Sequence, residues 1–111
     1  MQVEFPDARS QGLFNSDREL KREFGPENAR MIRRRLDDLK AVPSLENARG
    51  LPGKVEELRG KRKGQFSIRL AGGARLIFRP SANPVPTKQD GGIDLTQIRS
   101  IIIVNVEDYH D

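Results

Sequence analysis

The side chains best suited to proton transfer lie together at the end of the sequence. Tyr109 and His110 are the only tyrosine and the only histidine of the 111 residues, and they follow an apolar run within the stretch IIIVNVEDYHD. A free imidazole titrates near pH ~6.5, so it can take up and release a proton at neutral pH. Two interpretations stay open from these residues alone: a terminal tail, or a site carried at the end of a buried strand.

Positive charge is concentrated between residues 54 and 79, where eight residues are basic and only two, both glutamates, are acidic. Strand alternation places Arg69, Arg75 and Arg79 on the face opposite to the apolar side chains. Such a face, with a flexible basic loop at its rim, can bind several phosphates of a nucleic acid. The alternative is an ordinary solvent-exposed sheet face, but the density of cations favours binding. The eight are Lys54, Arg59, Lys61, Arg62, Lys63, Arg69, Arg75 and Arg79.

Composition limits the classes of protein that this chain can represent. The absence of cysteine excludes disulfides and thiolate metal sites. With a single histidine we expect no metal site, and we expect no cofactor. No run approaches the ~20 apolar residues of a membrane span, and the N-terminus lacks a signal-peptide layout. We therefore expect one cytoplasmic domain, residues 1–111, with no membrane partner. The net charge of +4 fits a polyanionic partner, or solubility alone.

The N-terminal half predicts a strand followed by two helices. MQVEF alternates and is stopped by Pro6. The stretch SDRE fits a capping box for a short helix that ends at Gly25. GPENARMIRRRLDDLKAV then carries one apolar stripe along a second helix. The arginines of that helix are expected to lie mostly on its solvent-exposed side; they are Arg30, Arg33, Arg34 and Arg35.

The second half predicts three strands. GQFSIRL and ARLIFR alternate and are joined by the glycine-containing turn AGGA, which is typical of a hairpin. The proline-rich segment 80–95 is expected to be a flexible surface loop. QIRSIIIVNV is apolar on both faces, which indicates a central strand. The predicted helices come early in the sequence and most of the predicted strands come late. This order favours an α+β domain, with a helical hairpin packed on one face of a mostly antiparallel sheet.

The stretch LPGKVEELRGKRKGQFSIRLAGGARLIFR, followed by a strand that ends in VEDYH, resembles the HigB-like killer toxins of the RelE/ParE superfamily. The resemblance covers about residues 12 to 110. It implies a RelE-like fold and the activity of a ribosome-dependent mRNA endonuclease of a type II toxin–antitoxin system. It also implies mRNA, the ribosome and a cognate antitoxin as partners, the antitoxin being a helix-turn-helix DNA-binding protein.

The resemblance implies roles for individual residues as well. In this family the ribose 2′-hydroxyl attacks the adjacent phosphate, which requires a base, an acid and stabilising cations. The terminal Asp-Tyr-His of the family matches Asp108, Tyr109 and His110. Glu56 stands where the family commonly has a second histidine, and carboxylates act as the base in related members. The implied RNA contacts are Arg59, Lys61, Arg62, Lys63, Arg69, Arg75 and Arg79.

Two other functions remain open from the sequence. One is a toxin that binds gyrase in the manner of ParE, and the other is an RNA-binding domain of the same fold that does not cut. The loop 80–95 is longer than the connection that is usual in the family, so contacts with the ribosome or the antitoxin can differ here.

Overall fold

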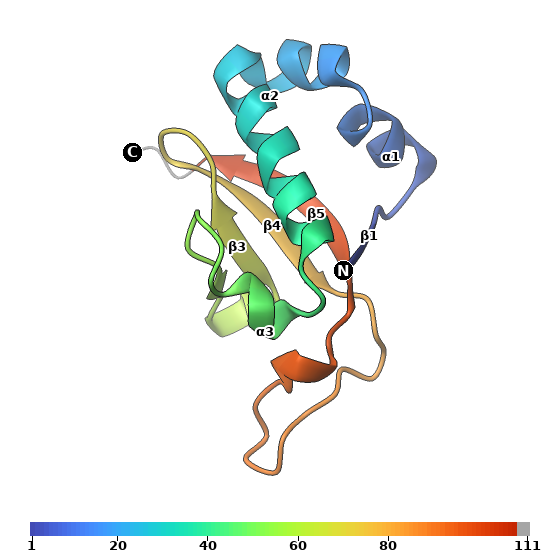
Figure 1. Cartoon of the computed structure of the whole chain (residues 1–111), viewed down its shortest axis with the longest axis vertical. Helices are drawn as coiled ribbons and strands as arrows, with labels where there is room; N and C mark the ends of the chain where they lie inside the picture. The colour runs from blue at the N-terminus through green and yellow to red at the C-terminus, as the bar shows by residue number, and fades with distance from the viewer. Residues whose placement is uncertain (109–111) are drawn as a thin grey trace.

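A five-stranded sheet covered by helices on one face forms the body of the protein (Figure 1), as seen in a computed structural model that describes residues 1–108. The strand order is β1-β5-β4-β3-β2, and only β1 and β5 pair in parallel. The predicted α+β architecture is confirmed. In chain order the elements are β1 Gln2–Glu4, α1 Ala8–Phe14, α2 Asp17–Ala41, α3 Leu45–Ala48, β2 Glu56–Glu57, β3 Phe66–Arg69, β4 Ala74–Pro80 and β5 Ser100–Asp108, with 3-10 turns η1 Gly60–Arg62 and η2 Leu95–Gln97.

The two predicted helices are the two halves of α2, which bends at Gly25. This glycine has φ 84°, a conformation that side chains with a Cβ rarely adopt. Ser16 caps the first half by accepting a hydrogen bond of 3.1 Å from the amide of Glu19, as the capping box predicts. Arg33 of the second half reaches back to Asp17 of the first at 2.9 Å. The bend separates the two halves of α2, and this ion pair links them.

A third helix, α1, was not predicted, although its start carries a recognisable cap. Asp7 accepts a hydrogen bond of 2.7 Å from the amide of Ser10, and this bond lowers the pKa of the Asp7 carboxyl. At the other end of α1 the ring of Phe14 is stacked between Phe5 and Phe24, at centroid distances of 5.5 and 6.4 Å. The aromatic stack joins β1, α1 and the bend of α2.

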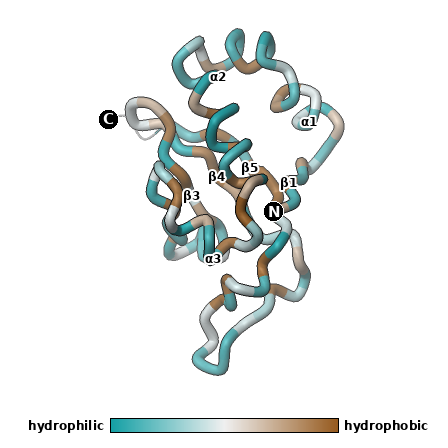
Figure 2. The backbone as a smooth tube through the Cα atoms, viewed as in Figure 1, coloured by the Kyte–Doolittle hydropathy of each residue, from teal (hydrophilic) through white to brown (hydrophobic). Residues whose placement is uncertain are grey.

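The hydrophobic core lies between α2 and the inner face of the sheet. The alternating apolar residues of β3 and β4 point to this side, and Phe66 stacks on Phe78 at 5.9 Å. Hydrophobic residues are concentrated along the central strands (Figure 2). None of the helices within residues 1–108 is long and apolar enough to cross a membrane. The fully buried side chains of this core include Leu20, Ile32, Leu36, Leu39, Ile68, Leu76, Phe78, Ile101 and Ile103.

An irregularity between Ile77 and Phe78 determines which side chains of β5 lie beside those of β4. Phe78 pairs with Ile103, whereas Ile77 pairs with Asn105, so β5 carries one extra residue there. A one-residue shift moves every following side chain to the other face of a sheet. The bulge therefore turns Val106 toward the core and brings Glu107, rather than Val106, opposite Arg75.

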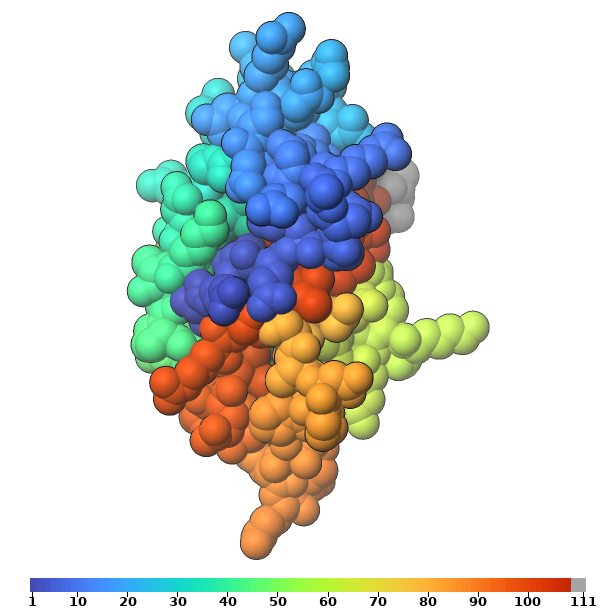
Figure 3. All heavy atoms as spheres, turned by 90° about the vertical axis from the view of Figure 1, so that its right-hand side faces the viewer, coloured from blue at the N-terminus to red at the C-terminus, as the bar shows by residue number. Residues whose placement is uncertain are grey.

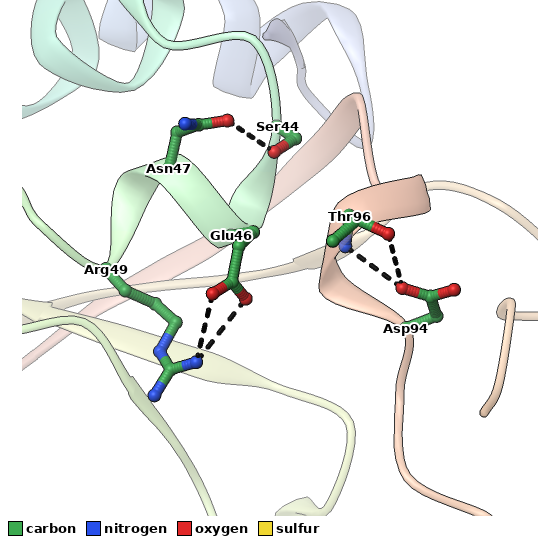
Figure 4. Close-up of polar contacts among 6 residues, drawn as sticks. All are labelled: Ser44, Glu46, Asn47, Arg49, Asp94 and Thr96. Atoms are coloured by element: carbon green, nitrogen blue, oxygen red, sulfur yellow. Dashed lines mark hydrogen bonds and ion pairs between the residues drawn. The ribbon is translucent and has the colours of Figure 1, made fainter. Parts of the chain in front are cut away.

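The segment between β4 and β5 extends beyond the end of the sheet (Figure 1) and protrudes from the body of the protein (Figure 3), and η2 near its end packs against α3. The amide of Leu45 donates a hydrogen bond of 2.9 Å to the carbonyl of Ile98, and Ile98 is buried in the core. Figure 4 shows α3 and η2 facing each other, with the hydroxyl of Thr96 donating to Asp94 at 2.6 Å. The predicted flexibility of residues 80–95 stays a prediction.

Candidate nucleic-acid interface

The sheet face opposite the helices carries the arginines that strand alternation predicted. Arg69 and Arg75 lie directly opposite each other across the β3–β4 hairpin, and Glu107 of β5 comes next in the same row. Arg69 is exposed, and its guanidinium has no hydrogen bond or ion pair with any residue in the described part of the chain. Arg75 is half-buried and donates to the carbonyl of Ala74 at 3.0 Å. Two adjacent guanidinium groups thus lie on one open surface.

A second row of residues crosses the same face one step along the strands. Glu56 pairs with Ser67, Ser67 pairs with Ile77, and Ile77 pairs with Asn105. Ser67 and Ile77 are buried although they lie away from the helices. The carboxylate of Glu56 remains accessible and contacts the ammonium of Lys54 at 3.3 Å. This row places the carboxylate of Glu56, which is the predicted general base, diagonally across from Arg69.

Arg69 is held in place through its backbone. Its amide donates to the carbonyl of Gly53 at 2.7 Å, and its own carbonyl accepts a hydrogen bond of 2.9 Å from Nε of Arg35. Gly53 has φ 100°, and a Cβ there would lie 2.8 Å from that Nε and 2.8 Å from the side chain of Ile68. Only glycine fits this position, which accounts for the glycine of LPG. Arg35 is the exception among the helix arginines that were expected to lie mostly on the solvent-exposed side, because only 8% of its surface is accessible.

The basic loop lies beside β2 at the rim of the face. Arg59, Lys61 and Lys63 are exposed and form no ion pair with other residues of the described chain. A hollow of about 660 Å³ opens between this loop and β2. Its lining combines cations with the candidate base; the residues are Lys54, Glu56, Glu57, Leu58, Arg59, Gly60 and Lys63.

Arg62 differs from the other cations of the loop. Its guanidinium binds both carboxylate oxygens of Glu107, each at 2.5 Å, and it also donates to Gln65 at 3.1 and 3.3 Å. Glu107 was not among the predicted site residues. The sequence shows it only as one of three acidic residues near the end, and its alignment with Arg75 depends on the bulge in β5.

The C-terminal candidates are only partly covered by the structure. Asp108 pairs with Ala74, so alternation along β5 directs its side chain to the opposite side of the strand from Glu107. Tyr109 and His110 lie outside the described residues. The structure therefore brings Glu56, Arg69 and Arg75 onto one face, and it does not bring Asp108 there. The functional roles of all these residues stay predictions.

The arrangement of helices on one face of a small, mostly antiparallel sheet is shared with toxins of known structure. One similar structure is a YoeB–YefM complex from Staphylococcus aureus, with a TM-score of 0.57, 16% identity, and coverage of 100% of this chain and 98% of that chain. Another is a YoeB/ParE toxin from Agrobacterium tumefaciens, with a TM-score of 0.57, 14% identity, and coverage of 99% and 100%. No protein-family model and no curated protein sequence matches the chain. At these identities the likeness shows the fold.

Proposed function

We propose that this protein is the toxin of a type II toxin–antitoxin system, and that it cuts mRNA on the ribosome. The observation that carries the proposal is the pair Arg69 and Arg75 on the open sheet face. Arg75 lies next to the end of β5, and Arg69 lies opposite Arg75 on β3. The chain continues from that end directly to Tyr109 and His110. The shared fold of the YoeB and ParE toxins supports the assignment to the RelE/ParE superfamily.

The cations of the face and the loop bind the RNA backbone in this proposal. Arg69 and Arg75 contact the phosphate that is cut, and a guanidinium is well suited to that role because its fork of donors fits two phosphate oxygens. Preorganised cations also stabilise the extra negative charge of the pentavalent phosphorane. The outer contacts come from other exposed cations of the sheet face and the basic loop; they are Arg59, Lys61, Lys63 and Arg79.

The proposed reaction moves two protons. Glu56 takes the proton of the ribose 2′-hydroxyl, whose oxygen attacks the adjacent phosphorus. The bond from phosphorus to the 5′ oxygen breaks, and His110 protonates that oxygen. The products are a 2′,3′-cyclic phosphate and a 5′-hydroxyl. Each proton transfer contributes about 10²–10⁴-fold to the rate. Tyr109 stacks on a base or orients the phosphate, and Asp108 is the least suited of the four candidates because its side chain alternates away from the face.

The partners follow from the same proposal. The protein acts in the cytoplasm on translated mRNA and is held inactive by a cognate antitoxin, which we expect to be a helix-turn-helix DNA-binding protein. The description of one structural neighbour as a complex of YoeB with YefM supports an antitoxin partner. Within the superfamily, the order of LPG, LRGKRKGQFSIRL, RLIFR and DYH favours the HigB-like branch.

A second candidate function is binding to gyrase in the manner of ParE. It is favoured by the description of the Agrobacterium neighbour, which carries both the YoeB and the ParE name. An RNA-binding domain that does not cut is the third candidate. These alternatives make no use of proton transfer by His110.

Expression in bacteria without the antitoxin separates the three candidates. We expect the wild-type protein to stop growth with loss of protein synthesis, and His110→Ala combined with Tyr109→Phe to abolish the arrest. Arg34→Ala, on the exposed side of α2, serves as the control and should remain toxic. Arrest that survives the double substitution would contradict catalysis, and arrest with DNA damage but continued translation would indicate gyrase.

A further inference from the structure

The ion pair between Arg62 and Glu107 joins the basic loop to the last residues of β5. The two residues are 45 positions apart in the sequence, and both guanidinium NH2 groups reach the carboxylate at 2.5 Å. The side chains are 34% and 25% exposed, so solvent screens this pair less than it screens most of the other ion pairs of the surface. A bidentate pair of this kind fixes orientation as well as distance.

Gln65 fixes the same guanidinium from a second side. Its Oε1 accepts from Nε of Arg62 at 3.3 Å and from a terminal nitrogen at 3.1 Å. The guanidinium of Arg62 is thus bound by a carboxylate and an amide of the protein. The ammonium groups of Lys61 and Lys63, by contrast, have no ion pair within residues 1–108 and are exposed. Within one short loop, therefore, the lysines are available to phosphates and the arginine is engaged.

The position of Glu107 gives the ion pair its importance. Glu107 lies opposite Arg75, in the row that also contains Arg69, and it precedes Tyr109 by two residues. A carboxylate without a cation at this place would attract the guanidinium of Arg75. Arg62 neutralises that carboxylate and tethers the strand end that carries it.

We propose that Arg62 is a positioning residue, which acts through Glu107 to hold the end of β5, from which the chain continues to Tyr109 and His110. The inference rests on the proposed function and gives Arg62 a different role from the RNA contact that the sequence suggested. It predicts that loss of Arg62 affects the rate of the chemical step, whereas loss of its neighbours Lys61 and Lys63 affects binding.

The kinetic test compares variants of the full chain in cleavage of mRNA on purified translating ribosomes. For Arg62→Ala we expect the rate at saturating ribosome concentration to fall roughly 10²-fold, the effect of displacing a catalytic group by ~1 Å, with little change in the concentration for half-maximal rate. Lys61→Ala and Lys63→Ala are matched controls, for which we expect the half-maximal concentration to rise and the saturated rate to stay. A higher half-maximal concentration for Arg62→Ala at an unchanged saturated rate would overturn the proposal.

Exchanging the two charges provides a rescue that simple loss of stability would not give. Arg62→Glu and Glu107→Arg should each be slow, and the double variant should recover most of the saturated rate because the pair is restored with reversed polarity. Arg62→Lys should recover only part of it, since an ammonium cannot bind the carboxylate as a fork. A double variant as slow as the single variants, although folded by thermal unfolding, would contradict the positioning role.

Amide hydrogen exchange at residues 106–108 gives a readout that does not depend on cleavage. We expect exchange there to become about tenfold faster in Arg62→Ala and to return toward the wild-type rate in the charge-swapped double variant. Unchanged exchange would overturn the proposal. If the wild-type protein cuts no RNA while exchange still responds to Arg62, the proposed function fails and the tether of β5 stands.

Discussion

Nε of Arg35 donates a hydrogen bond of 2.9 Å to the backbone carbonyl of Arg69, so a buried arginine of α2 holds the strand that presents an exposed one. The link continues to Gly53, whose carbonyl accepts from the amide of Arg69 at 2.7 Å. Through these contacts α2 fixes the backbone position of Arg69, which is one of the proposed phosphate-binding residues.

Replacing Arg35 by Met should destabilise the protein while it keeps most of the packing volume. The carbonyl of Arg69 would lose a hydrogen bond in a buried setting, which costs about 1–3 kcal/mol. Urea unfolding followed by circular dichroism measures the change. Arg34→Met is the matched control on the exposed side of the same helix, where we expect a change within about 0.5 kcal/mol. Equal stability of the two variants would show that the Arg35 contact contributes nothing.

Replacing Gly53 by Ala should also be destabilising, because the new methyl group would meet Arg35 and Ile68 at 2.8 Å and the backbone has φ 100°. Strain of either kind costs about 1–3 kcal/mol. Gly50→Ala is the control, since a Cβ at that position has its nearest neighbour at 3.7 Å. We expect thermal unfolding to show a lower Tm for Gly53→Ala only. A Tm equal to that of the wild type would exclude the tight contact.

Replacing Arg69 or Arg75 by Gln should weaken ribosome or RNA binding in a salt-dependent way. Each cation that contacts a phosphate releases a counterion, so the slope of log affinity against log salt should become shallower by about one for each arginine removed. Binding titrations at several salt concentrations measure the slope. Arg30→Gln on α2 has the same loss of charge away from the face and should leave the slope nearly unchanged. Identical slopes for all three variants would remove these arginines from the interface.

Glu56→Gln should lower the rate of cleavage without abolishing binding. Removing a general base typically costs about 10²–10⁴-fold in rate. Glu57→Gln is a close control, because it removes the same charge from the next residue of β2, whose side chain alternates to the other face. Single-turnover cleavage at saturating ribosomes measures both. Equal rates for the two variants would point to a different base.

The β3–β4 hairpin and the shared face of its arginines could be predicted from the sequence, because they depend on short-range patterns. The alternation of GQFSIRL and ARLIFR and the turn AGGA are sufficient to place Arg69 opposite Arg75, as the register confirms. The capping box at Ser16 and the break at Gly25 are equally local signals. Residues within a few positions of one another determine these features.

Features that depend on distant contacts could not be predicted in this way. Helical periodicity places Arg35 beside the apolar stripe of α2 and Arg34 on the opposite side, but it does not identify the carbonyl of β3 that Arg35 binds. The ion pair of Arg62 with Glu107 depends on the bulge beside Ile77, which changes the face of every residue that follows it in β5. Nothing in the local sequence of β4 or β5 marks that bulge.

The chemistry of the cut RNA ends tests the central claim most directly. The proposed attack by the 2′-hydroxyl predicts that mRNA recovered from ribosomes treated with the wild-type protein ends in a 2′,3′-cyclic phosphate, with a 5′-hydroxyl on the downstream fragment. His110→Ala should yield neither product. Fragments with a 3′-hydroxyl and a 5′-phosphate, or intact mRNA on ribosomes stalled by the wild-type protein, would contradict the account.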